Sequence, residues 1–303
     1  MGSTEVEQVR EIWQGLLAAL APPAEIPDWR RGYEELCDQF PIVEGTTIEQ
    51  IDAGGCPALL VTAPGASDET TISWTHSGGY VFGSAHGYRA FGSALSAASG
   101  AQVLLVDYRL APEANYPAAH DDAIAAYRWL LAQGRDPRSI VIGGDSAGGG
   151  LALGTLLRLV DEKTPLPAAG VLVSPVADLT CSGESMETRA HLDPIATKDM
   201  LAGLGALYAG EEPVTNRYLS PALGDLAGVP PLFVLVGTDE VLHDDALRVV
   251  DGVNASGGDA RLLVGEGQAH IWPFFHAILP KGQDAIEEMA TFIRTRTSTT
   301  VTN

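Results

Sequence analysis

The sequence RSIVIGGDSAGGGL, at residues 138–151, predicts a β-strand, a sharp turn and a helix in immediate succession. The β-branched run at its start is typical of a buried strand, and the apolar residues that follow it are typical of a buried helix. Between them, Gly144-x-Ser146-x-Gly148 has the pattern of a nucleophile elbow, a strained turn that holds a serine hydroxyl clear of the chain. The alternative is a glycine-rich loop that only joins the two elements, because this pattern also arises by chance.

Backbone N–H groups that could stabilise an oxyanion are predicted on two segments. Ala147 begins the helix after the serine, and Gly78 and Gly79 directly follow another predicted strand. Glycines let the backbone turn its amides inward, so these three N–H groups could converge on one oxygen. Ser77 departs from the HGGG motif of lipases at its first glycine but leaves the two later donors in place. His76 precedes the serine in the chain, so we expect it to orient this loop rather than to titrate in catalysis.

The acid and the histidine of a hydrolase with this elbow follow the serine in that order. Asp239 comes just after the buried strand at 232–236, which predicts that it lies at the same sheet edge as Ser146. His270 follows the strand at 261–264 and a glycine-containing turn, so the same argument applies to it. The competing residues are expected within the following helices: Glu240, Asp244 and Asp245 for the acid, and His276 for the base. The sequence therefore favours a Ser146–His270–Asp239 triad that cleaves an acyl group through an acyl-enzyme.

Composition limits the class of protein and its partners. A chain of 303 residues with 46% hydrophobic content can bury one large core, and its formal net charge of −21 argues against nucleic acid or an anionic membrane as a partner. Three widely spaced cysteines and the lack of a signal peptide or membrane-length apolar run predict thiols in the cytoplasm. No metal-ligand spacing and no nucleotide-binding motif is found, so we expect neither a metal nor a cofactor.

Apolar runs and helical periodicity alternate along most of the chain, which predicts βαβ units and an α/β fold with a mostly parallel sheet. Strands are expected at 46–51, 58–63, 70–75, 102–107, 139–143, 169–174, 232–236 and 261–264, and helices at 6–20, 29–40, 88–98, 119–133, from 148 onward, and at 198–208, 242–256, 271–279 and 283–294. The alternation stops at 178–216, where we expect an insertion that acts as a lid. The alternative there is an ordinary surface excursion.

Five blocks in order resemble the hormone-sensitive lipase family of α/β hydrolases, which includes the bacterial family IV esterases. They are His76-Ser77-Gly78-Gly79, Asp107-Tyr108-Arg109-Leu110-Ala111-Pro112-Glu113, Tyr116-Pro117-Ala118-Ala119-His120-Asp121-Asp122, Gly144-Asp145-Ser146-Ala147-Gly148-Gly149 and Asp239-Glu240-Val241-Leu242. The resemblance covers nearly the whole chain. It implies an α/β-hydrolase fold with an eight-stranded sheet, a helical cap and a substrate pocket between cap and sheet. It also implies activity on short to medium acyl esters and cis peptide bonds before prolines such as Pro112 and Pro117.

The resemblance also implies a domain organisation and a class of substrate. The expected parts are N-terminal helices of the cap at 1–40, a hydrolase core at 41–177, a cap insertion at 178–216, the rest of the core at 217–296 and a flexible tail at 297–303. Tyr80 and Trp272 are predicted to line the substrate pocket. Similar family members, down to Tyr80 and residues 83–86, include hydrolases of seven-membered lactones from monoterpene breakdown. The expected partner is therefore a small hydrophobic ester or lactone.

Other functions would fit the same residues. An amidase or acyltransferase would use the same triad, and a ligand-binding homologue could keep the fold without catalysis. The sequence also leaves open whether the chain is a monomer or a homodimer.

Overall fold

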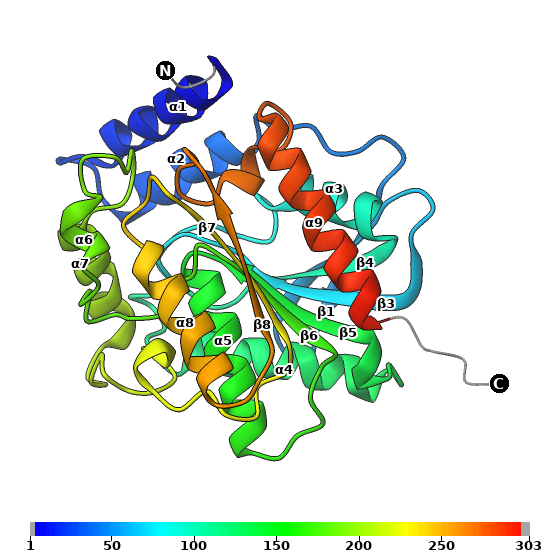
Figure 1. Ribbon diagram of the computed structural model, residues 1–303. Coiled ribbons are helices and arrows are strands. Elements are labelled where there is room, and N and C mark those ends of the chain that lie inside the picture. The colour runs from blue at the N-terminus through cyan, green and yellow to red at the C-terminus, as the bar shows by residue number, and fades with distance from the viewer. Residues whose placement is uncertain (1–3, 298–303) are drawn as a thin grey trace.

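A computed structural model describes residues 4–297 (Figure 1), and its centre is one sheet of eight strands in the order β1-β2-β4-β3-β5-β6-β7-β8. β2 pairs antiparallel with β1 and with β4, and the other neighbours run parallel. The predicted mostly parallel α/β fold is confirmed. The strands are β1 (Thr47–Asp52), β2 (Pro57–Thr62), β3 (Ser67–Thr75), β4 (Ala101–Val106), β5 (Ile140–Asp145), β6 (Ala169–Val173), β7 (Leu232–Gly237) and β8 (Ala260–Gly265).

Helices cover both faces of the sheet. α3 (Arg89–Ser99) and α9 (Pro280–Thr297) pack on one face, and α4 (Ala118–Ala132), α5 (Ala147–Asp161) and α8 (His243–Ala255) pack on the other (Figure 1). Because both faces are covered, β5, β6 and β7 are buried along their whole length, which is why their sequences are apolar throughout.

A third group of helices lies beyond the carboxyl ends of the parallel strands. It consists of α1 (Thr4–Leu20), α2 (Ile26–Cys37), α6 (Ser185–Thr188) and α7 (Lys198–Ala209), which gather at one side of the molecule (Figure 1). Two arginines tie the N-terminal pair to the rest. Arg10 in α1 donates to the carbonyl oxygen of Leu192 at 2.7 Å, and Arg30 in α2 donates to the carbonyl oxygen of Val81 at 2.9 Å.

Several element boundaries differ from the sequence prediction. α2 begins and ends three residues earlier than expected, and α9 starts at Pro280. The predicted helix at 271–279 is a short 3₁₀-helix, η3 (Trp272–Phe275). Ile271 before it has a left-handed backbone with φ of 45°, and Pro273 cannot donate the N–H that a longer helix needs. The other 3₁₀-helices are η1 (Pro137–Ser139) and η2 (Pro221–Leu223).

The peptide bonds before Pro112 and Pro117 are cis, as the family resemblance implies. Of the predicted tail, Thr297 ends α9, and residues 298–303 lie outside the described part of the chain. No helix within residues 4–297 is both long and apolar enough to cross a membrane.

Candidate active site

Ser146 stands on a strained turn between β5 and α5. Its φ of 55° and ψ of −123° are unusual for a residue with a side chain, and they are those expected of a nucleophile elbow. Small neighbours are required because the arms of the turn pass closely. A Cβ on Gly144 would lie 2.3 Å from the carbonyl oxygen of Gly148, and a Cβ on Gly148 would lie 2.1 Å from that of Thr75. A larger residue at either glycine of the motif would therefore clash with the backbone. The predicted elbow is present.

The serine meets the predicted histidine. His270 follows β8 and is almost fully buried, and its Nε2 lies 2.9 Å from the Ser146 Oγ, although 124 residues separate the two in the chain. The next residue, Ile271, donates its N–H to the Ser174 hydroxyl at 3.1 Å, which fixes the loop that carries the imidazole. This geometry lets the imidazole take the hydroxyl proton.

The prediction that Asp239 faces this histidine is wrong. The imidazole Nδ1 lies 2.8 Å from Oε2 of Glu240, the next residue in the chain. Asp239 instead forms an ion pair with Arg10 of α1 and accepts a hydrogen bond from the Thr238 hydroxyl at 3.0 Å. The physical reason is the conformation of the turn between β7 and α8, which holds both acidic residues. The Glu240 side chain folds back toward the sheet edge, where it accepts from the Gly237 N–H and faces His270.

Glu240 is fully buried and hydrogen-bonded at both oxygens. Its Oε1 accepts from the Ser174 hydroxyl at 2.8 Å and from the backbone N–H of Gly237, which leaves Oε2 for the imidazole. The turn fits closely because Gly237 has no side chain. A Cβ there would lie 2.1 Å from the carbonyl oxygen of Gln268, in the loop that leads to His270. The acid loop and the histidine loop are thus packed directly against each other.

Glu240 also sets the charge state of His270. Burial by itself lowers the pKa of the imidazole, but the hydrogen bond and the negative charge of Glu240, together with smaller effects of Asp193 and Asp145, raise the pKa of His270 above its usual value. A carboxylate on Nδ1 also keeps the proton on that nitrogen. Nε2 is then free to accept the proton of the Ser146 hydroxyl.

The predicted oxyanion donors lie beside the serine. Gly78 and Gly79 have φ of 119° and 60°, values that favour glycine, and both line the same cavity as Ser146 and His270. Ala147 is the first residue of α5, where a backbone N–H has no partner inside the helix. Within residues 4–297, no protein acceptor is recorded for these three N–H groups. Their role as oxyanion donors stays a prediction.

His76 is held inside this loop, and its role in orienting the loop stays a prediction. Its Nδ1 lies 2.7 Å from the carbonyl oxygen of Ser77, its ring stacks on Tyr108 with the centroids 4.2 Å apart, and its own carbonyl oxygen accepts from the Tyr108 hydroxyl at 2.8 Å. Burial lowers the pKa of His76 to about 4, so the ring is neutral near pH 7. We call residues 76–79 the oxyanion loop.

Ser77, the residue that departs from the lipase motif, belongs to a buried polar network. Its hydroxyl is hydrogen-bonded to Tyr33 of α2 and to the Tyr88 hydroxyl at 2.7 Å. The Tyr88 hydroxyl is also hydrogen-bonded to Asp145, which accepts from the Trp74 indole at 2.9 Å. Burial raises the pKa of Asp145 to about 7. The network runs from Asp145, directly before the nucleophile, to Tyr33 of α2. The sequence alone did not predict it.

The cavity over Ser146 is small and apolar. It measures about 50 Å³ and is walled by helices far away in the sequence, with Trp13 from α1, Tyr33 from α2 and Leu204 from α7. The predictions for Tyr80 and Trp272 are wrong, because both are buried elsewhere. Tyr80 stacks on Tyr208 with the ring centroids 3.9 Å apart, and Trp272 packs near Gly265 at the end of β8. Trp13, Tyr33 and Leu204 were missed because nothing in their local sequence marks them.

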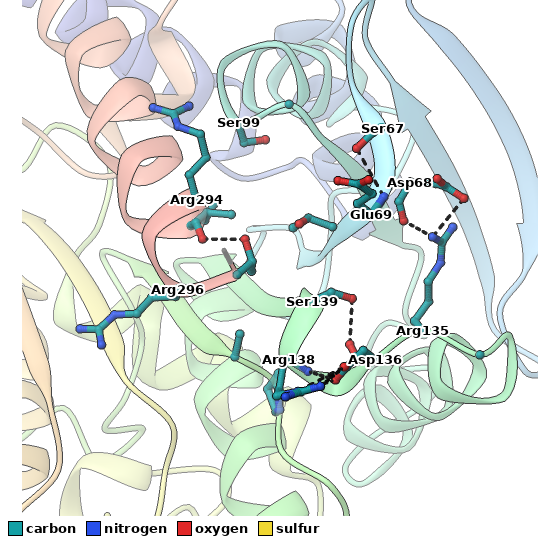
Figure 2. A pocket seen from close by; sticks show the side chains of 17 residues that line it. Ser67, Asp68, Glu69, Ser99, Arg135, Asp136, Arg138, Ser139, Arg294 and Arg296 are labelled. Atoms are coloured by element: carbon teal, nitrogen blue, oxygen red, sulfur yellow. Dashed lines mark hydrogen bonds and ion pairs between the residues drawn. The ribbon is translucent and has the colours of Figure 1, made fainter. Parts of the chain in front are cut away.

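A larger hollow of about 1330 Å³ opens at the opposite edge of the sheet, where β3, β5 and β6 begin (Figure 2). Two of the arginines that line it pair with acidic side chains. Arg138 pairs with Asp136 at 2.6 Å and Arg135 pairs with Asp68 at 3.2 Å. Among the described residues that line it there is no histidine to activate a serine. This hollow is therefore separate from the candidate active site.

Within residues 4–297, no cluster of three histidine, cysteine or acidic side chains has the arrangement needed to hold a metal ion. The expectation that no cofactor is needed stays a prediction.

An elbow serine after β5 and a histidine after the last strand of this sheet define the class of α/β hydrolases. A family model described as the alpha/beta hydrolase fold matches residues 72–274. An acetyl-hydrolase of Streptomyces hygroscopicus is 39% identical over 98% of both chains, and an esterase of Acinetobacter venetianus is 32% identical over 86% of both. The crystal structure of an esterase from the bacterial hormone-sensitive lipase family superposes with a TM-score of 0.95 at 41% identity, over 98% of this chain and 100% of the other.

The chain therefore belongs to the α/β-hydrolase family of carboxylic ester hydrolases that includes the bacterial hormone-sensitive lipase esterases.

Proposed function

We propose that this enzyme cleaves small to medium hydrophobic carboxylic esters with Ser146 as nucleophile, His270 as general base and acid, and Glu240 as the residue that orients the imidazole. The observation that carries the proposal is the continuous chain of two hydrogen bonds from the Ser146 hydroxyl through His270 to Glu240, of 2.9 and 2.8 Å. Ser146 and His270 line one cavity together with Gly78 and Gly79.

The reaction follows from these positions. His270 Nε2 takes the Ser146 proton as the Oγ–carbon bond forms, and the carbonyl π electrons move to the oxygen, where the N–H groups of Gly78, Gly79 and Ala147 donate to it. The tetrahedral intermediate collapses, the carbon–oxygen bond to the alcohol breaks, and His270 returns its proton to the leaving oxygen. Water then attacks the acyl-enzyme with the same proton transfers, releases the acid and restores the serine. Glu240 stabilises the imidazolium in each half-reaction.

Two features favour a compact, apolar substrate. The cavity walls are mainly aromatic and aliphatic, and the helices α1, α2 and α7 close over the serine. We propose that residues 1–40 and 178–216 act as the cap and that residues 41–177 and 217–296 form the hydrolase core. The names of the relatives, an acetyl-hydrolase and esterases, agree with short acyl groups. A lactone would be opened by the same steps, since its ring carbonyl is also an ester.

A substrate panel tests this proposal. We expect hydrolysis of p-nitrophenyl acetate and butyrate, with the activity lost in Ser146→Ala while the circular dichroism spectrum is retained. ε-Caprolactone in the same panel tests the lactone alternative, and p-nitroacetanilide tests the amidase alternative. Anilide cleavage at rates comparable with the esters would favour an amidase, and transfer of the acyl group to added methanol in preference to water would favour an acyltransferase. Full ester hydrolysis in Ser146→Ala would overturn the proposed function.

A cytoplasmic location stays a prediction. The three cysteines, Cys37, Cys56 and Cys181, are unpaired and buried, as expected for a protein of a reducing compartment.

A further inference from the structure

A second apolar hollow lies next to the cavity over Ser146. It measures about 440 Å³ and lies between the turn that follows α1 and the exposed side of α7. Leu17 and Leu207 line it and are each 37% exposed, so apolar surface faces solvent there. Among the described residues that line it, Asp199 alone carries a charge. We call this hollow the outer groove.

The outer groove and the catalytic cavity share a wall. Met200 and Leu204, one helical turn apart on α7, line both spaces. Leu204 also reaches the oxyanion loop, since a Cβ on Gly79 would lie 2.5 Å from the Leu204 Cδ1. Two flexible aliphatic side chains therefore separate the predicted oxyanion donors from the outer groove.

The sizes of the two spaces show why the separation matters. The catalytic cavity of about 50 Å³ has room for a few water molecules but not for the body of an ester, whereas ligand sites usually measure about 300–1,000 Å³. The outer groove, at about 440 Å³, lies within that range. When the carbonyl carbon of an ester lies at Ser146, the rest of the ester must extend beyond the catalytic cavity. The wall shared with the outer groove consists of Met200 and Leu204, whose side chains can change rotamer without a movement of the backbone.

We propose that the outer groove is the subsite for the longer arm of the substrate, and that Met200 and Leu204 form the gate that the arm displaces. The inference rests on the proposed esterase function and makes it more specific. The substrate class is an ester with one unbranched apolar arm of medium length, because a lining with one charge favours a hydrocarbon over a polar group. A hydrocarbon arm bound there would cover the apolar surface of Leu17 and Leu207, which otherwise faces solvent.

Gly203 provides a direct test. It lines the outer groove from α7, is exposed, and a Cβ built on it meets nothing within 4 Å. Gly203→Phe should fill the groove without entering the catalytic cavity. Ala202→Phe is the matched control, because it adds the same ring to an exposed position of α7 that does not line the groove.

The measured quantity is the ratio of kcat/KM for octanoate to that for acetate, as p-nitrophenyl esters below their micelle-forming concentrations. A second series, octyl against ethyl acetate, covers the case in which the alcohol is the long arm. In at least one series, Gly203→Phe should lower the ratio about tenfold or more, whereas Ala202→Phe should leave it within twofold of the wild type. Met200→Ala, which opens the gate, should raise the ratio severalfold. A ratio does not depend on the fraction of protein that is folded.

The outcomes separate the two proposals. If the wild type hydrolyses acetate and Gly203→Phe leaves both ratios unchanged, the subsite is refuted and the esterase function stands. If no ester is hydrolysed, the proposed function itself fails. Binding to phosphatidylcholine vesicles that Gly203→Phe abolishes, with both ratios unchanged, would overturn the subsite in favour of membrane docking.

Discussion

Replacing Glu240 by glutamine should inactivate the enzyme through the tautomer of His270. In the structure, Oε1 of Glu240 accepts hydrogen bonds from the Ser174 hydroxyl and the Gly237 N–H. A glutamine must keep its carbonyl oxygen on these donors, so its NH₂ group faces the imidazole Nδ1. Nδ1 must then accept, and the ring proton moves to Nε2. That nitrogen lies 2.9 Å from the Ser146 hydroxyl and could no longer take its proton.

The expected loss is about 10³- to 10⁴-fold in kcat, or about 4 to 5.5 kcal/mol of transition-state stabilisation, by analogy with the same acid-to-amide change in serine proteases. Part of the activity should return in Glu240→Asp, which restores the charge at a greater distance. The fold should persist, because glutamine has nearly the same shape and keeps the contacts of Oε1.

Asp239→Asn is the matched control, since it makes the same chemical change one residue earlier. Asp239 pairs with Arg10 and does not contact His270, and the two side chains of the pair are 19% and 20% exposed. We expect activity within a few-fold of the wild type and a loss of stability of about 1–3 kcal/mol, since the pair is partly buried.

The assay is steady-state hydrolysis of p-nitrophenyl acetate, with circular dichroism to confirm folding. A folded Glu240→Gln enzyme with more than a tenth of wild-type kcat, or a thousandfold loss in Asp239→Asn, would refute the assignment of the acid.

Three further predictions concern pH and the buried polar groups. His270 must be neutral to act as a base and its pKa is raised, so kcat/KM should fall as the pH drops, with a midpoint at a pH above the usual histidine pKa of about 6.5. A kcat/KM that stays constant from pH 5 to 8 would argue against His270 as the base. Ser77→Ala removes hydrogen bonds of the buried network but no predicted oxyanion donor, so thermal denaturation should show a loss of stability of about 1–3 kcal/mol, while kcat/KM for the acetate ester stays within tenfold of the wild type. A fall of several hundredfold in kcat/KM would mean that this hydroxyl serves catalysis directly. Burial raises the pKa of Asp245 from 3.8 to about 8, and its Oδ1 has no partner among the described residues, so the folded state holds a proton that the unfolded state releases. The stability of the wild type should therefore fall as the pH rises from about 4 to 8, and that of Asp245→Asn should fall less steeply. Tm values with the same pH dependence in both proteins would be the contrary result.

The parts of the site that the sequence predicts are those fixed by backbone geometry. The spacing of Gly144, Ser146 and Gly148 predicts the elbow because only glycine tolerates such close backbone contacts. The strand-and-helix alternation predicts the sheet, and a parallel sheet brings the residues after its strands to one edge. That is why His270 could be placed next to Ser146 from the sequence.

The acid could not be predicted correctly because Asp239 and Glu240 both lie in the turn between β7 and α8. Hydrophobic periodicity predicts the strand and the helix, but not the direction of each side chain in the turn that joins them. In the structure this turn directs the aspartate outward to Arg10 and the glutamate inward to His270.

The cavity walls could not be predicted because they depend on packing between distant helices. Tyr80 has a left-handed backbone with φ of 63°, and its ring lies against Tyr208 rather than in the cavity. Trp13 and Tyr33 reach the cavity only because α1 and α2 fold over the sheet edge, and helical periodicity marks them simply as core residues.

The most direct test of the central claim is covalent labelling with a fluorophosphonate followed by peptide mass spectrometry. The geometry of Ser146, His270 and Glu240 predicts one adduct per chain, located on Ser146, with labelling slowed strongly in Glu240→Gln and little in Asp239→Asn. An unmodified Ser146 in an enzyme that is inactivated by the reagent, or an adduct on another residue, would contradict it.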